Sequence, residues 1–196
     1  MLRKARIAVF VSGSGTNLQA LIDSDEIKSG ELCLVVSNKA DAYALKRAEA
    51  AGIRGEVLPS KGTEFDRRAL ELLESNNIDI VVLAGFLRVL GKEFVDRYEN
   101  RVINIHPALI PSFCGKGMYG LKVHEAVLER GVRITGATVH YVNEAADGGE
   151  IILQRAVEVL PDDTPLTLQR RVMEEAEWKL LPLATELVCK MYLEDK

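Results

Sequence analysis

Four short apolar runs mark the first half of the chain. They fall at Ile7–Val11, Leu32–Val36, Ile80–Ala84 and Val102–Ile105. Each run is apolar at nearly every position, which is typical of strands buried on both faces of a parallel sheet. Between the runs the apolar spacing is helical, at Asn17–Ser24, Tyr43–Ala51 and Glu64–Ser75. Strands that alternate with helices predict an α/β fold with a doubly wound, mostly parallel, Rossmann-like sheet.

The second half of the chain has a different pattern. Thr135–Val142 and Glu150–Val159 are β-rich and are separated by the loop Asn143–Gly149, so we predict that they pair as antiparallel additions to the sheet. Thr164–Leu187 has helical spacing, and Pro182 predicts a kink or a break within it. Because there is no internal repeat and no long linker, we expect residues 1–196 to form a single domain.

Composition and charge narrow the functional class. Apolar residues make up 47% of the chain, which excludes a disordered protein. The net charge of -4 argues against general nucleic-acid binding, although a local basic site stays open. Cys33, Cys114 and Cys189 lack metal-ligand spacing and are interpreted as reduced thiols. The apolar run after the basic residues 3–6 is too short for an export signal or a membrane span, so a cytoplasmic protein is expected.

A glycine-rich turn follows the first predicted strand. Its residues are Ser12-Gly13-Ser14-Gly15-Thr16-Asn17. Glycines allow a backbone to approach a ligand closely, and the start of the next helix offers N–H groups to an anion. The turn matches neither the dinucleotide fingerprint nor a P-loop. A tight strand–helix turn explains the pattern about as well as a phosphate site for a small substrate.

Asn104 and His106 stand two residues apart at the end of the fourth apolar run. Strand alternation places both side chains on one face, and ligands of open α/β sheets bind at the carboxyl ends of strands. An amide donor beside an imidazole suits acyl transfer, where the attacked oxygen becomes an anion. A structural hydrogen bond is the alternative for His106.

Asp147 occupies an Asp-Gly-Gly loop between the two β-rich segments. Such loops are common turns, so the carboxylate gains weight only if it meets His106. In that case it would raise the pKa of His106, keep the ring cationic and hold a water that relays a proton.

These segments, in this order, resemble the phosphoribosylglycinamide formyltransferase family. The resemblance runs along almost the whole chain, and the set of motifs is specific although no single motif is. The matching segments are Val9–Ala20, Val36–Ala40, Val82–Leu90, Asn104–Pro111, Gly136–His140 and Asp147-Gly148-Gly149.

The resemblance implies an enzyme that moves the formyl group of 10-formyltetrahydrofolate to the amine of glycinamide ribonucleotide, in purine synthesis and without a metal. Its catalytic residues would be Asn104, His106 and Asp147. The N-terminal half would bind phosphate through Gly13, Ser14, Gly15, Thr16 and Asn17, and Glu177 would reach the ribose. The folate would contact Lys61, Leu87, Arg88, Val89, Leu90, Asn104, Val142, Asn143, Glu144, Ala145 and Ala146. Small-molecule partners are expected, with neither nucleic acid nor membrane, in a monomer or a homodimer.

The sequence departs from the family pattern at Ser112–Lys122, which is longer and rich in glycine, and no role follows for Cys114 or Lys116. Formyltetrahydrofolate deformylase shares the Asn-x-His and Asp elements, but it would have no use for a phosphate turn. Methionyl-tRNA formyltransferase would need a further C-terminal domain and a basic surface. A nucleotide-binding module without chemistry is the alternative from another class.

Overall fold

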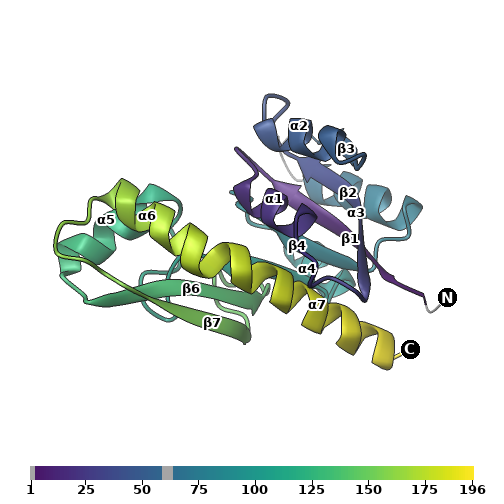
Figure 1. The fold of residues 1–196 in the computed structure, drawn as a ribbon. Coiled ribbons are helices and arrows are strands. Elements are labelled where there is room, and N and C mark those ends of the chain that lie inside the picture. The colour runs from purple at the N-terminus through teal and green to yellow at the C-terminus, as the bar shows by residue number, and fades with distance from the viewer. Residues whose placement is uncertain (1–2, 59–63) are drawn as a thin grey trace.

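The computed structural model describes residues 3–58 and 64–196 of the protein, so Lys61 lies outside the described residues. Seven strands form one sheet in the order β3-β2-β1-β4-β5-β6-β7 (Figure 1). They are β1 (Ala5–Val11), β2 (Gly30–Ser37), β3 (Arg54–Val57), β4 (Ile80–Leu83), β5 (Val102–His106), β6 (Ile134–Tyr141) and β7 (Ile151–Glu158).

The first five strands are parallel. β2 and β3 lie on one side of β1 and β4 and β5 lie on the other, so the strand order reverses between β1 and β4. Crevices at such switch points are where open α/β sheets bind ligands. β6 then pairs antiparallel with β5, and β7 pairs antiparallel with β6. Both the doubly wound parallel sheet and its antiparallel extension, predicted from the apolar patterns, are confirmed.

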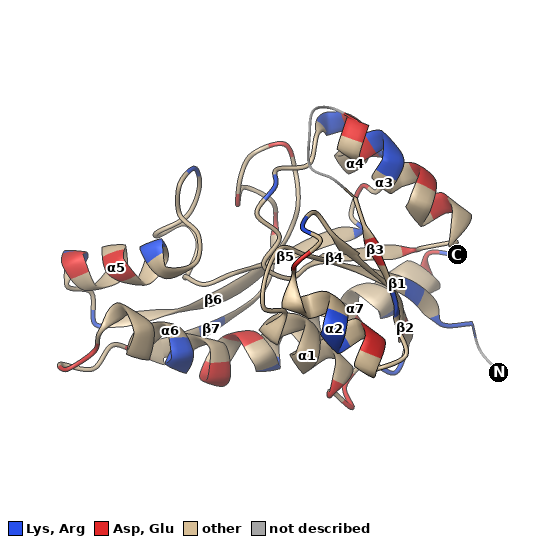
Figure 2. Ribbon diagram, turned by 90° about the horizontal axis from the view of Figure 1, so that it is seen from above, with Lys and Arg blue, Asp and Glu red and all other residues tan. Residues whose placement is uncertain are grey.

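Helices cover both faces of the sheet (Figures 1 and 2). They are α1 (Thr16–Ile22), α2 (Tyr43–Ala50), α3 (Glu64–Ser75), α4 (Lys92–Arg97), α5 (Leu121–Arg130), α6 (Pro165–Val172) and α7 (Trp178–Glu194), with a π-helical segment at Met173–Glu177. The run in β1 is apolar throughout because both faces of this strand are buried. Ile7 and Val9 pack under α1, α2 and α7, whereas Ala8 and Phe10 pack under α3 and α4.

Three elements carry no clear pattern in the sequence. β3 is a four-residue strand at the edge of the sheet with mostly exposed side chains, so it needs no apolar run. α4 is only six residues long, and α5 follows directly on the glycine-rich departure. Short or peripheral elements take their structure from packing more than from periodicity.

Of the kink or break predicted at Pro182, the break is wrong. α7 continues through Pro182 to Glu194, well past the predicted end at Leu187. The proline lacks the N–H that would bond the carbonyl of Trp178, which is the first residue after the π-helical segment. The π-helical segment therefore ends directly before the residue whose carbonyl loses its partner. Pro182 is also buried, so packing against the sheet holds the helix together.

Candidate active site

A cleft of about 560 Å³ opens at the carboxyl ends of β4 and β5. Leu87–Leu90 forms one wall and Val142–Ala146 forms the other, and both were singled out in the sequence for a folate pocket. Leu87 and Val89 are 56% and 69% exposed, so the first wall presents apolar surface that the protein itself does not cover. Asn104, His106, His140 and Asp147 also line the cleft.

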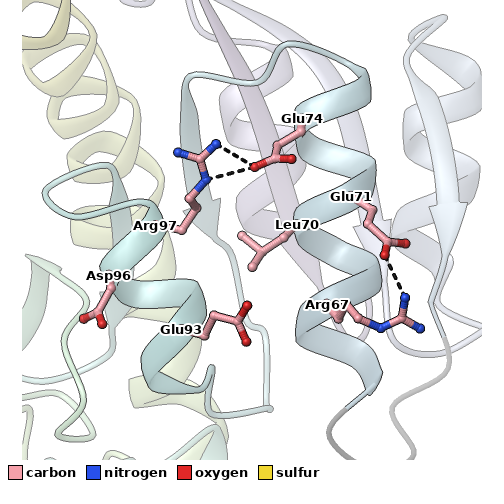
Figure 3. Close-up of a pocket in the computed structure, with 7 residues that line it drawn as sticks. All are labelled: Arg67, Leu70, Glu71, Glu74, Glu93, Asp96 and Arg97. Atoms are coloured by element: carbon pink, nitrogen blue, oxygen red, sulfur yellow. Dashed lines mark hydrogen bonds and ion pairs between the residues drawn. The ribbon is translucent and has the colours of Figure 1, made fainter.

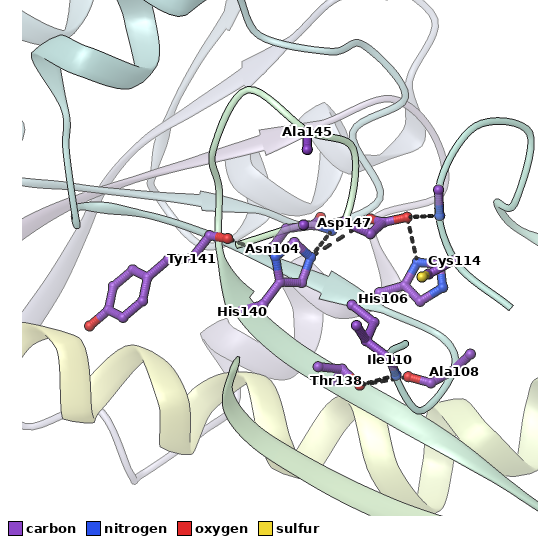
Figure 4. A network of polar contacts seen from close by, with 12 residues as sticks. Asn104, His106, Ala108, Ile110, Cys114, Thr138, His140, Tyr141, Ala145 and Asp147 are labelled. Atoms are coloured by element: carbon purple, nitrogen blue, oxygen red, sulfur yellow. Dashed lines mark hydrogen bonds and ion pairs between the residues drawn. The ribbon is translucent and has the colours of Figure 1, made fainter. Parts of the chain in front are cut away.

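Two pairs of cross-strand neighbours build the polar part of the cleft (Figure 4). Asn104 and His106 share one face of β5, as the alternation predicted, and the register places His140 and Thr138 of β6 directly opposite them. His106 and His140 are 3% and 2% exposed, so their ring nitrogens interact with the protein rather than with bulk water. The register therefore gathers an amide and two imidazoles at the end of one strand pair.

His140 fixes the orientation of the Asn104 amide. The Nδ1 of His140 lies 2.7 Å from the carbonyl oxygen of Tyr141, which can only accept, so Nδ1 carries the proton. The other ring nitrogen, Nε2, then accepts a hydrogen bond from Nδ2 of Asn104 at 3.1 Å. The second N–H of the Asn104 amide remains available to a ligand oxygen.

His106 is held between a carbonyl and a carboxylate. Its Nε2 donates to the Phe113 carbonyl oxygen at 2.8 Å, and its Nδ1 faces Oδ2 of Asp147 at 3.5 Å. We expected Asp147 to keep this ring cationic, and that expectation is wrong for the ligand-free site. Burial lowers the pKa of His106 below its ordinary value, and it outweighs the opposing effect of Asp147. The resting ring is therefore neutral near pH 7, with its Nδ1 lone pair toward Asp147.

Asp147 is the ionised partner at this site. Burial alone would raise the pKa of Asp147, but the neighbouring His140 ring and the hydrogen bond from the Gly115 N–H lower it below its ordinary value. The Gly115 N–H donates to Oδ2 at 2.8 Å, and His140 Nε2 lies 3.7 Å from Oδ1. A side chain on Gly149 would come within 1.7 Å of the Tyr141 carbonyl oxygen, which explains why the loop needs glycine after Asp147.

The glycine-rich departure has a role that sequence reasoning missed. Its main chain supplies the Phe113 carbonyl to His106 and the Gly115 N–H to Asp147, and Lys116 lines the cleft beside it. Cys114 donates to the Pro111 carbonyl oxygen. Main-chain contacts of this kind leave no signal in residue identity.

Two histidines also went unassigned. His140 did carry a signal, because Thr138 and His140 are polar at alternate positions of a predicted strand. His124 on α5 is fully buried, and neither ring nitrogen has a hydrogen-bond partner within the described part of the chain. Burial, reinforced by nearby His106, lowers the pKa of His124 to about 4, so its ring is neutral.

The glycine turn between β1 and α1 gains a cation from elsewhere in the chain. Gly15 is the N-cap of α1 with a left-handed backbone and offers no side-chain acceptor to the first helical N–H groups. Arg47 of α2 donates to the Ser14 carbonyl oxygen at 2.9 Å, so a basic side chain stands beside the turn although none lies within it. Oε2 of Glu177, from the π-helical segment, accepts from Nδ2 of Asn17 at 2.6 Å. Burial raises the pKa of Glu177 above its ordinary value.

A second hollow, of about 500 Å³, lies between α3 and α4 (Figure 3). Its charged side chains are largely paired with one another, as in Arg97–Glu74 and Arg67–Glu71. It holds no histidine and lies away from the strand ends, so the first cleft is the better site for chemistry. Within residues 3–58 and 64–196, no three histidine, cysteine or acidic residues are grouped as metal ligands.

Comparison with known proteins shows the family of the chain. The model of the formyl transferase family matches residues 5–185. The chain belongs to this family. A phosphoribosylglycinamide formyltransferase from Haemophilus influenzae is 40% identical over 185 residues, covering 91% of this chain and 84% of that protein. The structure of glycinamide ribonucleotide transformylase 1 from Symbiobacterium toebii superimposes with a TM-score of 0.89 at 39% identity, covering 96% of this chain and 89% of that one.

Other formyl transferase relatives are longer proteins. The human trifunctional purine biosynthetic protein adenosine-3 is 47% identical over 192 residues, which cover 95% of this chain but only 18% of that protein. A chloroplastic phosphoribosylglycinamide formyltransferase from Arabidopsis thaliana is 40% identical over 195 residues. Relatives therefore occur in more than one compartment, and a cytoplasmic location stays a prediction. No helix in the described ranges is both long and apolar enough to cross a membrane.

Proposed function

We propose that this formyl transferase moves the formyl group of 10-formyltetrahydrofolate to the amine of glycinamide ribonucleotide. The observation that carries the proposal is the convergence of Asn104, His106 and Asp147 at a cleft with an uncovered apolar wall. Pockets that bind a flat, largely apolar ligand are mostly apolar with a few placed polar groups. Purine biosynthesis is named for the human relative, and the same substrate class suits this site.

The division of labour follows from the hydrogen bonds. The free N–H of Asn104 donates to the formyl oxygen as it becomes an anion, because the other N–H is engaged by His140. Neutral His106 accepts, directly or through a water held by Asp147, the proton that the amine loses on attack. Asp147 stabilises the imidazolium so formed. The new C–N bond is complete when the bond to the folate nitrogen breaks, and that nitrogen takes the proton.

The remaining residues bind the two substrates. The pterin ring lies between Leu87–Leu90 and Val142–Ala146, with Asn143, Glu144 and Ala145 in the second wall. Phosphate binds at Gly13–Asn17 through main-chain N–H groups and hydroxyls, aided by Arg47. Glu177, poised against Asn17, contacts the ribose. Lys61 as a contact for the glutamate tail lies outside the described residues and stays a prediction.

A single assay separates the proposal from its alternatives. Release of tetrahydrofolate is followed with the formyl donor alone and after addition of glycinamide ribonucleotide. Turnover that requires the ribonucleotide and yields its formylated product supports the proposal. Turnover with water as the only acceptor identifies a deformylase and refutes it. Ligand binding without turnover, unchanged in His106→Ala, identifies a binding module instead.

A further inference from the structure

The Leu87–Leu90 wall has no regular secondary structure, so something outside it must hold its shape. It lies between β4, which ends at Leu83, and α4, which begins at Lys92. At its start, the Leu87 N–H donates to the Ser12 hydroxyl oxygen at 3.0 Å. Phe86 and Leu90 are buried in the core around Phe10. Between them, Leu87 and Val89 are exposed and line the cleft, so their side chains give the stretch no anchor in the core.

Asp66 on α3 reaches this stretch with both carboxylate oxygens. Oδ2 accepts from the Gly91 N–H at 2.9 Å, directly behind the wall. Oδ1 lies 3.7 Å from Nε of Arg88, an ion pair between side chains that are only 16% and 22% exposed. The guanidinium of Arg88 also packs over the Phe65 ring at 4.9 Å, which fixes the direction of approach. The Asp66 carboxylate therefore connects α3 to Arg88 within the wall and to Gly91 directly after it.

Gly91 shows how closely the two parts fit. A side chain at Gly91 would place its Cβ 2.7 Å from Oδ2 of Asp66, so a methyl group there would have to displace the Asp66 carboxylate. The backbone of Gly91 has a φ of -76° and a ψ of 165°, which any residue can adopt. The glycine is thus required by Asp66 and not by a turn.

The same anchor extends to the opposite wall. Lys92, the residue after Gly91, places Nζ 2.9 Å from Oε1 of Glu144 in the Val142–Ala146 wall. The two walls are therefore joined next to Gly91, by an ion pair whose side chains are 65% and 61% exposed.

We propose that Asp66 is a positioning residue for the pterin slot: through Gly91 and Arg88 it sets the main chain of Leu87–Leu90 in the form that the folate binds. The inference rests on the proposed function, because it assumes that this slot takes the folate. Asp66 touches no substrate, and its effect should appear in folate affinity rather than in chemistry or in ribonucleotide binding.

Calorimetric titration with 5,8-dideazafolate, which needs no turnover, tests the role. A hydrogen bond to a charged group is worth enough for Asp66→Ala to weaken binding about tenfold or more. Asp66→Asn keeps an acceptor for Gly91 but loses the charge facing Arg88, so its affinity should fall between the two. Gly91→Ala should weaken binding through the same contact. In the double variant Asp66→Ala/Gly91→Ala the losses should not add, because both remove one interaction.

Glu71→Ala is the matched control, since Glu71 lies on the same helix and pairs with exposed Arg67. The role is supported if folate affinity falls while the KM for the ribonucleotide and the kcat at saturating folate stay within twofold. It is overturned if Asp66→Ala and Gly91→Ala bind the analogue like wild type, if their losses add, or if both substrates weaken equally. Should Asp66→Ala not fold, Asp66→Asn and Gly91→Ala decide the question. Wild-type protein that does not bind the analogue refutes the proposed function itself.

Discussion

His140 should govern catalysis although it needs no contact with either substrate. Its Nε2 accepts from Asn104, and the Tyr141 carbonyl oxygen keeps Nδ1 protonated so that Nε2 is always the acceptor. Replacing His140 with Phe keeps a buried ring but removes that acceptor. The Asn104 amide then retains an unpaired donor and is free to rotate its carbonyl oxygen toward the developing oxyanion.

The size of the effect follows from the cost of an unsatisfied buried donor. That cost is about 1–3 kcal/mol. If this cost raises the free energy of the transition state by the same amount, kcat falls roughly 5- to 150-fold. The KM of each substrate should change little, because the cleft walls and the glycine turn are untouched. His140→Gln, which offers an amide oxygen at a similar reach, should recover part of the loss.

The pH profile provides a second, independent readout. His140 contributes to the lowered pKa of Asp147, and phenylalanine would offer that carboxylate no polar neighbour, so His140→Phe should raise the pKa. Activity that needs ionised Asp147 is lost as the pH falls through its pKa. The acid limb of the kcat profile should therefore move to higher pH in the variant. Tyr141→Phe is the control, since it keeps the carbonyl that His140 uses. Wild-type kcat and an unmoved acid limb in His140→Phe, with the fold intact by circular dichroism, would refute this reasoning.

Three further variants and one condition test the rest of the site. Asn104→Ala should lower kcat by about 10²–10³ while each KM stays within a small factor, as steady-state kinetics will show. Asp147→Asn should lower the pKa of His106 further, because Asp147 opposes the effect of burial on that pKa. The pH–rate profile should therefore shift, and an unchanged profile would contradict the role of Asp147. Gly15→Val should raise the KM of the ribonucleotide sharply, since a Cβ there would lie 2.6 Å from that of Ala44, while titrated folate affinity stays near wild type. A chelator should leave turnover unchanged, and lost activity that added metal restores would exclude the metal-free mechanism.

The order and type of the long elements could be predicted from the sequence because they follow from burial. A run such as Ile7–Val11 is apolar at each position only if both faces of its strand are covered, which the two clusters around β1 confirm. The helix does not break at Pro182, because the surroundings of a residue can outweigh its local preference. The π-helical segment before it and the burial of Pro182 override the local preference of proline.

The candidate catalytic side chains could be found in the sequence, but their protonation states could not. The alternation of side chains along a strand indicated that Asn104 and His106 share one face, and the cleft brings them together with Asp147. The neutral state of His106 depends on burial, which only the folded chain reveals. Arg47 reaches the glycine turn from another helix, so no local motif contains it.

Strand β6 connects these features, and its direction matters. Antiparallel pairing sets His140 against Asn104 and Thr138 against His106, so a single register serves both catalytic side chains. The Thr138 hydroxyl donates to the Ala108 carbonyl oxygen at 2.7 Å and accepts from the Ile110 N–H at 3.1 Å. These bonds hold the chain that carries the Phe113 carbonyl back to His106. A slip of one residue would turn Thr138 and His140 to the opposite face, leaving the amide and the imidazole present but unaligned.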